Sequence, residues 1–389
     1  MQTRLIKGPT LLKVIGECEI LGVKFRNTII LYNNNKYLPI EKDTDTIIKV
    51  KKDSNYIDVG NNENYSTNRI GTAIWSNIIT NILNTNRKRI IIIGSSDTGK
   101  STLTLYLANK LISEGYKPLI IDSDIGQGEL APPACIGAKI LTKQTIDLAK
   151  SNPNRINFIG NIQPIGYELR ITNCIKKIYN RLNRHDSITI INTDGYIGNN
   201  KRNYKINLIE KIKPDCIICM GEEEEENIKN DFFFSIRNKF KNHSNLHILQ
   251  GQSPSKEIQK SFFERREKRL KKYSILLKTF TKNFNIHKQK LISVYYKNKF
   301  FFIHNIPNTK IQRTETRNDH LENILNNKSF IRDRFVGLSL NYDYEKIIGF
   351  GLIKDFTNSY FIMQSSINKF DHIFLSDIKL SLERNYSYQ

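Results

Sequence analysis

The chain has 389 residues, of which 39% are hydrophobic and 10% aromatic, so it can build two or three folded domains and is not a disordered protein. Its 60 lysines and arginines against 38 acidic residues give a formal net charge of +22, which favours nucleic acid as a partner, followed by an anionic membrane surface. A proteome rich in lysine and asparagine would explain part of this excess, so charge alone supports nucleic acid only weakly.

The cysteine content and the shortness of the apolar runs indicate the compartment. Five cysteines are an odd, sparse set for this length, which indicates a reducing environment rather than a disulfide framework. The N-terminal residues lack the apolar core of a signal peptide, and no apolar run approaches the length of a membrane span. We therefore expect a soluble intracellular protein without membrane contact, which is cytoplasmic, or nuclear if the source is eukaryotic.

Residues 1–66 predict a small β-rich domain. Short β-branched runs, separated by glycine, proline and asparagine, cover residues 11–14, 18–21, 28–32 and 46–50. Nothing in this segment points to catalysis, so it is either a platform for substrate or a partner, or packing support. A helix over residues 70–84 then leads into a central domain, which we expect to span residues 67–275.

The central domain begins with a phosphate-binding motif. The apolar run Ile90 to Ile93 is typical of a strand buried on both faces of a parallel sheet, and GSSDTGKS after it fits the pattern GxxxxGK[ST]. Leucines at helical spacing follow, so a helix begins at the loop. An ordinary glycine turn before a core helix is the alternative. The residues expected to bind the nucleotide are Gly94, Ser95, Ser96, Asp97, Thr98, Gly99, Lys100, Ser101 and Thr102.

The chemistry of this motif assigns a role to each part of the loop. Gly94 and Gly99 lack the Cβ that would obstruct a backbone folded around phosphate oxygens. The loop amides and the positive end of the helix face the anion. Lys100 reaches the β- and γ-phosphates, and the Ser101 hydroxyl ligates Mg²⁺.

A second apolar strand, over residues 117–122, ends in Asp122-Ser123-Asp124. An acidic residue at the tip of a nearby strand completes the magnesium site of a phosphate-binding loop, so Asp122 and Asp124 are both candidates.

Apolar strands alternate with helical stretches from residue 89 to residue 249. This alternation predicts a mostly parallel sheet with helices on both faces and with ligands at the carboxyl ends of the strands. The expected fold is α/β, a central P-loop NTPase of the RecA-like or SIMIBI-like kind flanked by two smaller β-rich domains. The expected strands cover 90–93, 117–122, 156–160, 188–193, 215–220 and 246–249, and the expected helices 100–113, 167–183, 201–212 and 229–240.

Two later features lie in the order expected for such a site. The strand over residues 188–193 runs into Asp194-Gly195-Tyr196, where a glycine followed by an aromatic would either stack a base or form a turn with a half-buried tyrosine. Residues 256–273 form a strongly basic helix in which Arg265 and Arg269 share a face, with Arg266 beside them. It is either a solvated charged helix or a source of arginines that close over phosphates.

Three further patterns are weaker. The pair Cys216 and Cys219 has no second pair, His243 and His247 lack the glutamate of a metalloprotease, and the acidic run 222–226 suits a solvated loop, so we expect no metal at any of them. Residues 276–389 return to β patterning and predict a β-rich C-terminal domain. Within it Gly349-Phe350-Gly351 lies inside a strand, which indicates a bulge or close packing rather than a nucleotide loop.

Taken together, five stretches resemble the polynucleotide 5′-hydroxyl kinases, a family that includes the RNA kinases of messenger-RNA 3′-processing, tRNA splicing and ribosomal-RNA processing, and their archaeal homologues. The chain looks like an archaeal-type member. The stretches run in the family's order, through residues 90–273. They are the loop GSSDTGKST, the motif DSDIGQGELAPP, the segment FIGNIQPIG, the clasp-like INTDGYIG and the lid-like ERREKRLKKY.

The resemblance implies ATP-dependent phosphorylation of a 5′-hydroxyl on RNA, with DNA left open, with Mg²⁺ as cofactor and RNA-processing proteins as further partners. By resemblance, Lys100 and Ser101 would hold the triphosphate and Mg²⁺. Asp124 would orient or deprotonate the attacking hydroxyl, or act through the metal, and Gln127 would help to place the metal water or a phosphate. The clasp around the terminal nucleotide would be Thr193, Gly195 and Tyr196, and the lid Arg265, Arg266 and Arg269.

The chain departs from the family's pattern in two places. Tyr196 replaces the usual tryptophan, which weakens stacking but keeps a π-face, and the lid arginines are closely spaced, which leaves open the one that contacts phosphate. Two other functions stay open. One is a non-catalytic ATP-binding scaffold of an RNA-processing complex, as in family members that have lost catalysis. The other is a related GTPase, although the guanine-reading tetrapeptide of that class is not found at the expected strand end.

Overall fold

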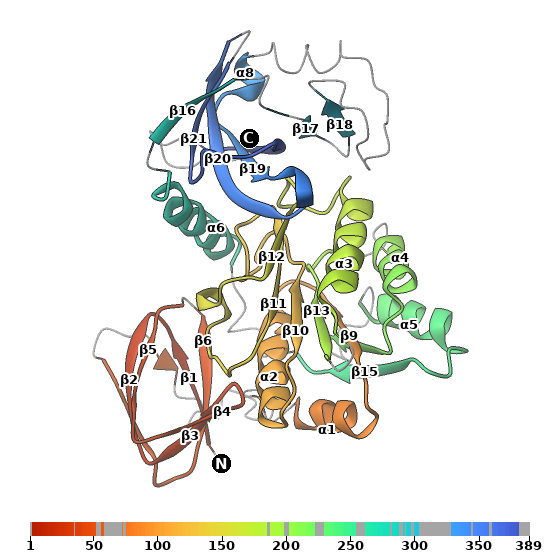
Figure 1. The fold of residues 1–389 in the computed structure, drawn as a ribbon. Helices are drawn as coiled ribbons and strands as arrows, with labels where there is room; N and C mark the ends of the chain where they lie inside the picture. The colour runs from red at the N-terminus through yellow and green to blue at the C-terminus, as the bar shows by residue number, and fades with distance from the viewer. Residues whose placement is uncertain are drawn as a thin grey trace. The chain divides into compact units, whose positions relative to one another are not determined.

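The structure is a computed structural model that describes most of the chain (Figure 1). The described residues are 2–34, 36–51, 56–57, 72, 75–184, 187–197, 202–221, 229–253, 261–280, 282–287, 291, 293–296, 299–302, 328–343, 345–357 and 360–380. They divide into two compact units. Unit 1 comprises Met1–Asp124, Ala138–Asn154 and Ile175–Ser261, and unit 2 comprises Ile125–Gly137, Arg155–Cys174 and Phe262–Gln389.

Two antiparallel sheets form the N-terminal part of unit 1, in agreement with the expected β-rich segment. One sheet has the strand order β4-β3-β6-β1-β8 and the other β5-β2-β7. Buried and exposed residues alternate along β2, so that Leu12 and Val14 enter the core. The sequence does not predict β1, β4, β6 and β8; charged residues interrupt the apolar patterns of the first three, and β8 has only two residues. The strands are β1 (Gln2–Lys7), β2 (Thr10–Ile15), β3 (Glu17–Ile20), β4 (Val23–Arg26), β5 (Ile29–Tyr32), β6 (Tyr37–Lys42), β7 (Ile47–Val50) and β8 (Tyr56–Ile57).

The central sheet has seven strands, five of which lie wholly in unit 1. Those five follow the order β10-β13-β9-β14-β15, and every neighbouring pair is parallel. The four isoleucines of β9 have no exposed surface, because both faces of this parallel sheet are covered. The expected P-loop α/β architecture is confirmed. The five strands are β9 (Arg89–Gly94), β10 (Leu119–Asp122), β13 (Thr189–Asn192), β14 (Cys216–Met220) and β15 (His247–Gly251); the other two are β11 (Cys135–Ile140), which the sequence does not predict, and β12 (Arg155–Phe158).

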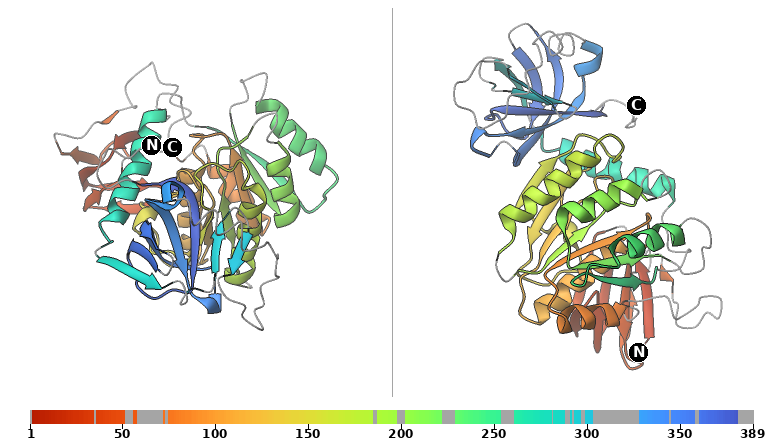
Figure 2. Two further views of the ribbon diagram at one scale, coloured as in Figure 1. Left: turned by 90° about the horizontal axis from the view of Figure 1, so that it is seen from above. Right: turned by 90° about the vertical axis from the view of Figure 1, so that its right-hand side faces the viewer.

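The helices follow the alternation read from the sequence. The path from β9 through α2 to β10 moves one way along the sheet, and the path from β13 through α4 and α5 to β15 moves the other way. Right-handed crossovers therefore put α2 on one face and the pair α4 and α5, which lie side by side in both views, on the other (Figures 1 and 2). The helices are α1 (Ser76–Asn84), α2 (Lys100–Ser113), α3 (Glu168–Leu182), α4 (Arg202–Ile212) and α5 (Lys229–Phe240), with a 3₁₀ turn at Leu148–Lys150.

Unit 2 contains a second seven-stranded sheet, of order β16-β21-β20-β19-β22-β17-β18, which confirms the β-rich C-terminal segment. The pairing register shifts where β20 passes Gly349, and a Cβ at Gly349 would lie 2.6 Å from Ile367 Cγ1, so this glycine serves close packing as predicted. The elements are α6 (Phe262–Leu277), β16 (Lys282–His287), β17 (Ser293–Tyr296), β18 (Lys299–Phe302), α8 (Lys328–Ile331), β19 (Arg334–Ser339), a 3₁₀ turn at Asn341–Asp343, β20 (Ile347–Phe356), β21 (Tyr360–Ser365) and β22 (His372–Lys379).

Several predictions remain outside what the structure describes. The acidic run 222–226, the first residues of the basic helix (256–260) and the predicted domain boundary at residue 66 are not among the described residues. The predicted boundary at residue 275 falls inside α6, so the division into three domains stays a prediction. Cys216 and Cys219 are buried free thiols in β14. Within the described part of the chain, no helix is long and apolar enough to cross a membrane.

A buried histidine in unit 2 makes its stability depend on pH. The His372 side chain is fully buried in β22, where Ser293 Oγ lies 2.8 Å from its Nδ1. Burial lowers the pKa of His372 to about 4, although the charge of Asp371 opposes the shift. The unfolded chain therefore takes up this proton near pH 6.5, and the folded unit does so only near pH 4. Stability is lost as the pH falls through this window.

His372→Asn removes the titrating group but keeps a polar partner for Ser293. We expect the melting temperature of this variant to fall less between pH 7 and pH 5 than that of the wild type. The difference should be about 3 °C or more by differential scanning fluorimetry. His243→Asn, in an exposed turn, is the matched control and should retain the wild-type slope. Equal slopes for all three proteins would contradict this account.

Candidate active site

The phosphate-binding loop lies between β9 and α2, as predicted. Gly99 adopts φ = +88° immediately before the first turn of α2, and Asp97 adopts φ = +62°. The loop also closes on itself, since Thr98 Oγ1 donates to the carbonyl oxygen of Ser95 at 3.0 Å. A Cβ at Gly94 would lie 2.5 Å from the carbonyl oxygen of Met220, so this strand end admits only glycine. The backbone amides at the start of α2 are thus turned toward one point, the arrangement that binds an anion.

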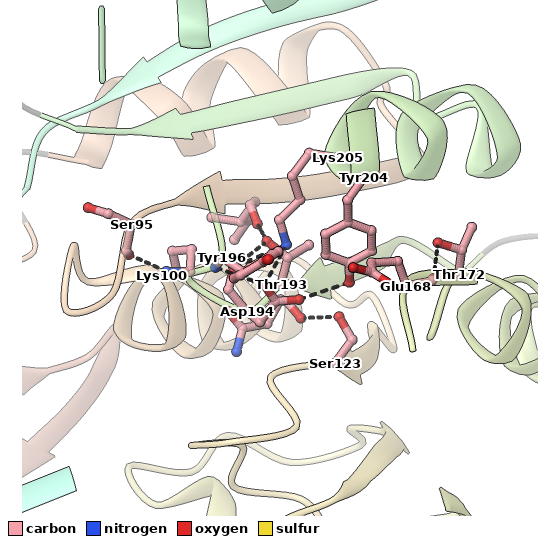
Figure 3. Close-up of polar contacts among 12 residues, drawn as sticks. Ser95, Lys100, Ser123, Glu168, Thr172, Thr193, Asp194, Tyr196, Tyr204 and Lys205 are labelled. Carbon is pink, nitrogen blue, oxygen red and sulfur yellow. Dashed lines mark hydrogen bonds and ion pairs between the residues drawn. The ribbon is translucent and has the colours of Figure 1, made fainter. Parts of the chain in front are cut away.

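Lys100 is buried within this loop. Its ammonium donates to the carbonyl oxygen of Ser95 at 2.5 Å (Figure 3). Burial lowers the pKa of the Lys100 ammonium to about 8. The negative charge of Asp124, which has the largest effect among the neighbouring carboxylates, opposes this shift, and the positive charge of Lys205 adds to it. A polyphosphate at the loop would supply the negative charge that favours the protonated lysine.

The end of β10 meets the first turn of α2 through a single asparagine. Asn192 Nδ2 donates to Asp122 Oδ1 at 2.9 Å and to Ser101 Oγ at 3.2 Å. The backbone carbonyl oxygen of Asn192 accepts from Ser123 Oγ at 2.7 Å. Asp122 is 3% exposed and Ser101 is partly exposed, so Asn192 links a buried carboxylate to a partly exposed hydroxyl. Asn192 was not recognised from sequence, because a polar residue at a strand end is equally typical of an ordinary turn.

The donors at this edge fit Mg²⁺. Ser101 and Asp122 supply oxygens, and Asp124 follows two residues later on the same strand end. Magnesium prefers oxygen donors and keeps several waters and phosphate oxygens, so it needs only one or two protein ligands. No cluster of three or more histidine, cysteine or acidic side chains occurs in the described part of the chain, which is compatible with such a sparse site. Asp122 is linked to Ser101 through Asn192, so Asp122 and Asp124, the residue that the resemblance favours, both stay candidates for this role.

The turn after β13 packs against the phosphate-binding loop. Thr193 is fully buried, and its hydroxyl donates to the carbonyl oxygen of Ile92 at 2.8 Å, which ties the end of β13 to β9. A Cβ added to Gly195 would lie 2.5 Å from the backbone nitrogen of Ser96. Tyr196 follows with a partly exposed side chain. The three predicted clasp residues therefore lie beside the phosphate-binding loop, and their contact with a nucleotide stays a prediction.

The close approach of Gly195 to Ser96 gives a direct test of this packing. We expect Gly195→Ala to weaken ATP binding by about tenfold or more, because the added methyl group pushes the backbone of the phosphate-binding loop away from its anion-binding shape. Isothermal titration with ATP measures the change. Gly115→Ala, at a glycine whose added Cβ meets no atom within 4 Å but whose φ of +85° strains an alanine, is the control; it should lower the melting temperature yet bind ATP as the wild type does. Wild-type affinity in Gly195→Ala would rule out the steric argument.

The arginine-rich helix α6 belongs to unit 2, where it is fixed to the second half of the DSDIGQGELAPP motif. Gln127 Nε2 donates to the carbonyl oxygen of Arg265 at 3.4 Å, Lys268 Nζ donates to the carbonyl oxygen of Gln127 at 3.2 Å, and Lys272 donates to that of Gly128. The ring of Tyr273 is fully buried, and its hydroxyl donates to the carbonyl oxygen of Pro133 at 3.2 Å. Gln127 is thus a contact of the lid-like helix. Its role with a metal water or a phosphate, and the roles of Arg265, Arg266 and Arg269, stay predictions.

Residues 94–273 match the family described as the mRNA cleavage and polyadenylation factor CLP1 P-loop. This segment is therefore similar to the CLP1 P-loop domain. The match begins at Gly94 of the phosphate-binding loop and ends at Tyr273 of α6, so it covers all five stretches of the resemblance drawn from the motifs. Together with the archaeal relatives described next, this match confirms the resemblance to polynucleotide 5′-hydroxyl kinases.

The chain is also similar to curated archaeal enzymes. The polyribonucleotide 5′-hydroxyl-kinase of Pyrococcus horikoshii is 37% identical over 136 residues, covering 35% of this chain and 38% of that protein. The enzyme of the same name from Methanocaldococcus jannaschii is 31% identical over 199 residues, covering 51% and 52%. That of Pyrococcus furiosus is 32% identical over 181 residues, covering 46% and 48%. The chain therefore spans about half, or less, of the length of these relatives.

Solved structures extend the likeness of fold beyond residues 94–273. The structure of a wild-type Clp1p–Pcf11p complex matches with a TM-score of 0.64 at 14% identity, over 97% of this chain and 94% of that one. A second structure of the interface between Pcf11p and Clp1p matches with a TM-score of 0.63, also at 14% identity, over 97% and 96%. The β-rich segments on either side of the P-loop domain belong to the same architecture.

Proposed function

We propose that this protein is an ATP-dependent polynucleotide 5′-hydroxyl kinase, which transfers the γ-phosphate of ATP to the 5′-OH of RNA. The observation that carries the proposal is the grouping at one sheet edge in unit 1. The buried ammonium of Lys100, the Ser101–Asn192–Asp122 hydrogen bonds and the turn around Gly195 all lie there. This grouping provides a binding site for a triphosphate beside the turn around Gly195, which would receive the second substrate. The named activity of the archaeal relatives supports the acceptor class.

Nucleotide binding falls to the loop from Gly94 to Thr102. Its amides and the N-terminal end of α2 bind the phosphate oxygens, and Lys100 exchanges its hydrogen bond to Ser95 for a bond to the β- or γ-phosphate. When bound, Mg²⁺ would neutralise charge on the β- and γ-phosphates. Ser101 would hold it, with Asp124 or Asp122 as the acidic partner.

Transfer then needs an aligned 5′-oxygen. The 5′-oxygen of the RNA forms a bond to the γ-phosphorus while the bond from that phosphorus to the β-phosphate oxygen breaks, and ADP leaves. Asp124 orients the hydroxyl and accepts its proton, and Tyr196 offers a π-face to the terminal base. The transition state is loose, so positioning and charge neutralisation contribute more than the general base does.

The three arginines of α6 are proposed to neutralise the charge that develops on the transferred phosphate. Guanidinium groups suit this task because they stay protonated and bind phosphate oxygens in pairs. The loop that holds this helix, through Gln127 and Gly128, follows directly after Asp124 in the sequence. A short stretch of chain therefore connects the lid contacts to the proposed acceptor residue. DNA as a second acceptor, RNA-processing proteins as partners, and a cytoplasmic or nuclear location belong to the same proposal.

A transfer assay tests the proposal. The purified protein is incubated with Mg²⁺, ATP labelled in the γ-phosphate, and matched RNA and DNA oligonucleotides that end in a 5′-OH; label on the RNA is expected. No label under any metal condition, with ATP binding intact, would favour the non-catalytic scaffold instead. Competition of ATP binding by GTP at equal concentration would favour the GTPase class.

A further inference from the structure

A buried ion pair lies next to the proposed site, and no step of the reaction uses it. Lys205, on α4, is fully buried, and its Nζ lies 3.0 Å from Oδ1 of Asp194, which is 4% exposed. The same Nζ donates to the carbonyl oxygen of Asp194 at 3.1 Å. Desolvation makes a buried ion pair costly, and well-packed apolar residues often replace one without loss of stability. The presence of the pair at this place therefore calls for a reason other than stability.

Asp194 is the centre of a larger set of contacts (Figure 3). Its Oδ1 accepts from the backbone nitrogen of Tyr196 at 2.8 Å, which closes a tight turn over residues 194–196. Its Oδ2 accepts from the hydroxyl of Tyr204 at 2.9 Å. The ammonium of Lys205 also lies over the Tyr204 ring, 4.6 Å from its centroid. The carboxylate thus has a backbone, a phenol and an ammonium as partners, and together they leave it one orientation.

This orientation fixes the other two residues of the turn, Gly195 and Tyr196. Gly195 is held so close to Ser96 that an added Cβ would lie 2.5 Å from the Ser96 nitrogen, and the Tyr196 ring is held 6.3 Å from that of Tyr204. The Asp194 carboxylate accepts from the backbone nitrogen of Tyr196, so the shape of the turn depends on this carboxylate. Any loss of the ammonium leaves a buried charge without its counter-charge and releases the turn.

We propose that Lys205 and Asp194 are positioning residues for the kinase reaction, and that their buried ion pair sets the turn that receives the terminal nucleotide of the RNA. The inference rests on the proposed function, because it concerns the acceptor site of that reaction. Lys205 acts through Asp194 and touches neither substrate. Its loss should therefore act on RNA binding more than on ATP binding, because the phosphate-binding loop has hydrogen bonds of its own.

The test compares Lys205→Met with the wild type in the same transfer assay, with RNA and ATP varied separately. We expect the KM for 5′-OH RNA to rise by about tenfold or more, and the KM for ATP to change by less than about threefold. Arg155→Met is the matched control. It breaks another buried ion pair, between Arg155 Nη1 and Asp343 Oδ2 at 2.6 Å in unit 2, and should lower the melting temperature without changing the KM for RNA.

Tyr204→Phe is a milder second variant that keeps the test decisive if Lys205→Met does not fold. It removes only the hydroxyl that donates to Asp194, and it should raise the KM for RNA by about two- to fivefold. A KM for RNA within twofold of the wild type in the folded variants would overturn the proposal, and so would a parallel rise in both KM values. A wild-type protein that transfers no phosphate would instead overturn the proposed function, so the two failures can be told apart.

Discussion

Replacing Lys100 by alanine is expected to abolish phosphate transfer while the protein stays folded. The ammonium is the one buried positive charge that lies inside the phosphate-binding loop among the described residues, and it is held at the Ser95 carbonyl next to the anion-binding amides. Without it the γ-phosphate loses both its position and its charge neutralisation, so kcat/KM should fall by about 10³-fold or more. Alanine suits the first turn of a helix and removes a buried charge, so α2 should form as before.

Circular dichroism and a rapid-quench transfer assay measure the two halves of this prediction. Lys110→Ala is the matched control in the same helix. Lys110 lies in the last turn of α2, where its Nζ forms an ion pair with Glu19 Oε1 at 2.6 Å, and its loss should leave the turnover within about twofold of the wild type. Unchanged turnover in Lys100→Ala would show that the phosphate-binding loop has been assigned wrongly.

Loss of the lid arginines should have the second largest effect. Arg265, Arg266 and Arg269 lie on α6 with partly buried side chains. Arginines that stabilise the transition state of phosphoryl transfer contribute about 10³- to 10⁵-fold in kcat. The triple variant with alanine at all three positions should therefore lose about 10³-fold in kcat.

The affinity for ATP distinguishes this effect from a loss of binding. An interaction made only in the transition state lowers kcat and kcat/KM together, so the equilibrium binding of ATP should change by less than about threefold. Each single variant then identifies the arginine that contributes most. Lys271→Ala, an exposed basic residue of the same helix, is the control for general loss of positive charge. A triple variant with a kcat within threefold of the wild type would contradict the lid assignment.

The lysines of α6 have a different role from its arginines. Lys268 and Lys272 donate to backbone carbonyls of Gln127 and Gly128, so they hold the helix rather than present a charge to a ligand. The sequence shows a run of basic residues and cannot separate these two uses, because both need the same residue type on one helix. The structure separates them by the partners of each side chain.

The parts of the molecule with a strong local pattern were predicted well. The helix at residues 100–113 and the apolar run of β9 agree with the structure, because a glycine-rich loop and a buried parallel strand impose residue types that few other structures need. The strand β11 was missed, because its CIGAKI sequence contains glycine and alanine and follows a proline-rich loop. The sequence analysis also missed β16 and β22, because lysine, asparagine and histidine interrupt the apolar pattern of β16, and histidine, serine, aspartate and lysine interrupt that of β22.

Within the site, the residues that act through others were not predictable. Lys205 lies in the amphipathic pattern of α4, where a lysine is normally solvated, and nothing local indicates that its ammonium is fully buried. Asn192 is likewise one polar residue among several at the end of a strand. The role of each depends on residues about ten to 90 positions away in the sequence. Lys205 pairs with Asp194, and Asn192 bonds to Ser101 and Asp122. Local patterns carry no information on such pairs.

The central claim is that the phosphate held by the Lys100 loop is delivered to a 5′-oxygen of RNA. Two RNA oligonucleotides of one sequence, one ending in a 5′-OH and the other in a 5′-phosphate, test it most directly in a single-turnover reaction with γ-labelled ATP and Mg²⁺. The account predicts that label appears on the 5′-OH oligonucleotide only, and that Lys100→Ala labels neither. Equal labelling of both oligonucleotides, or labelling by the Lys100→Ala variant at the wild-type rate, would contradict it.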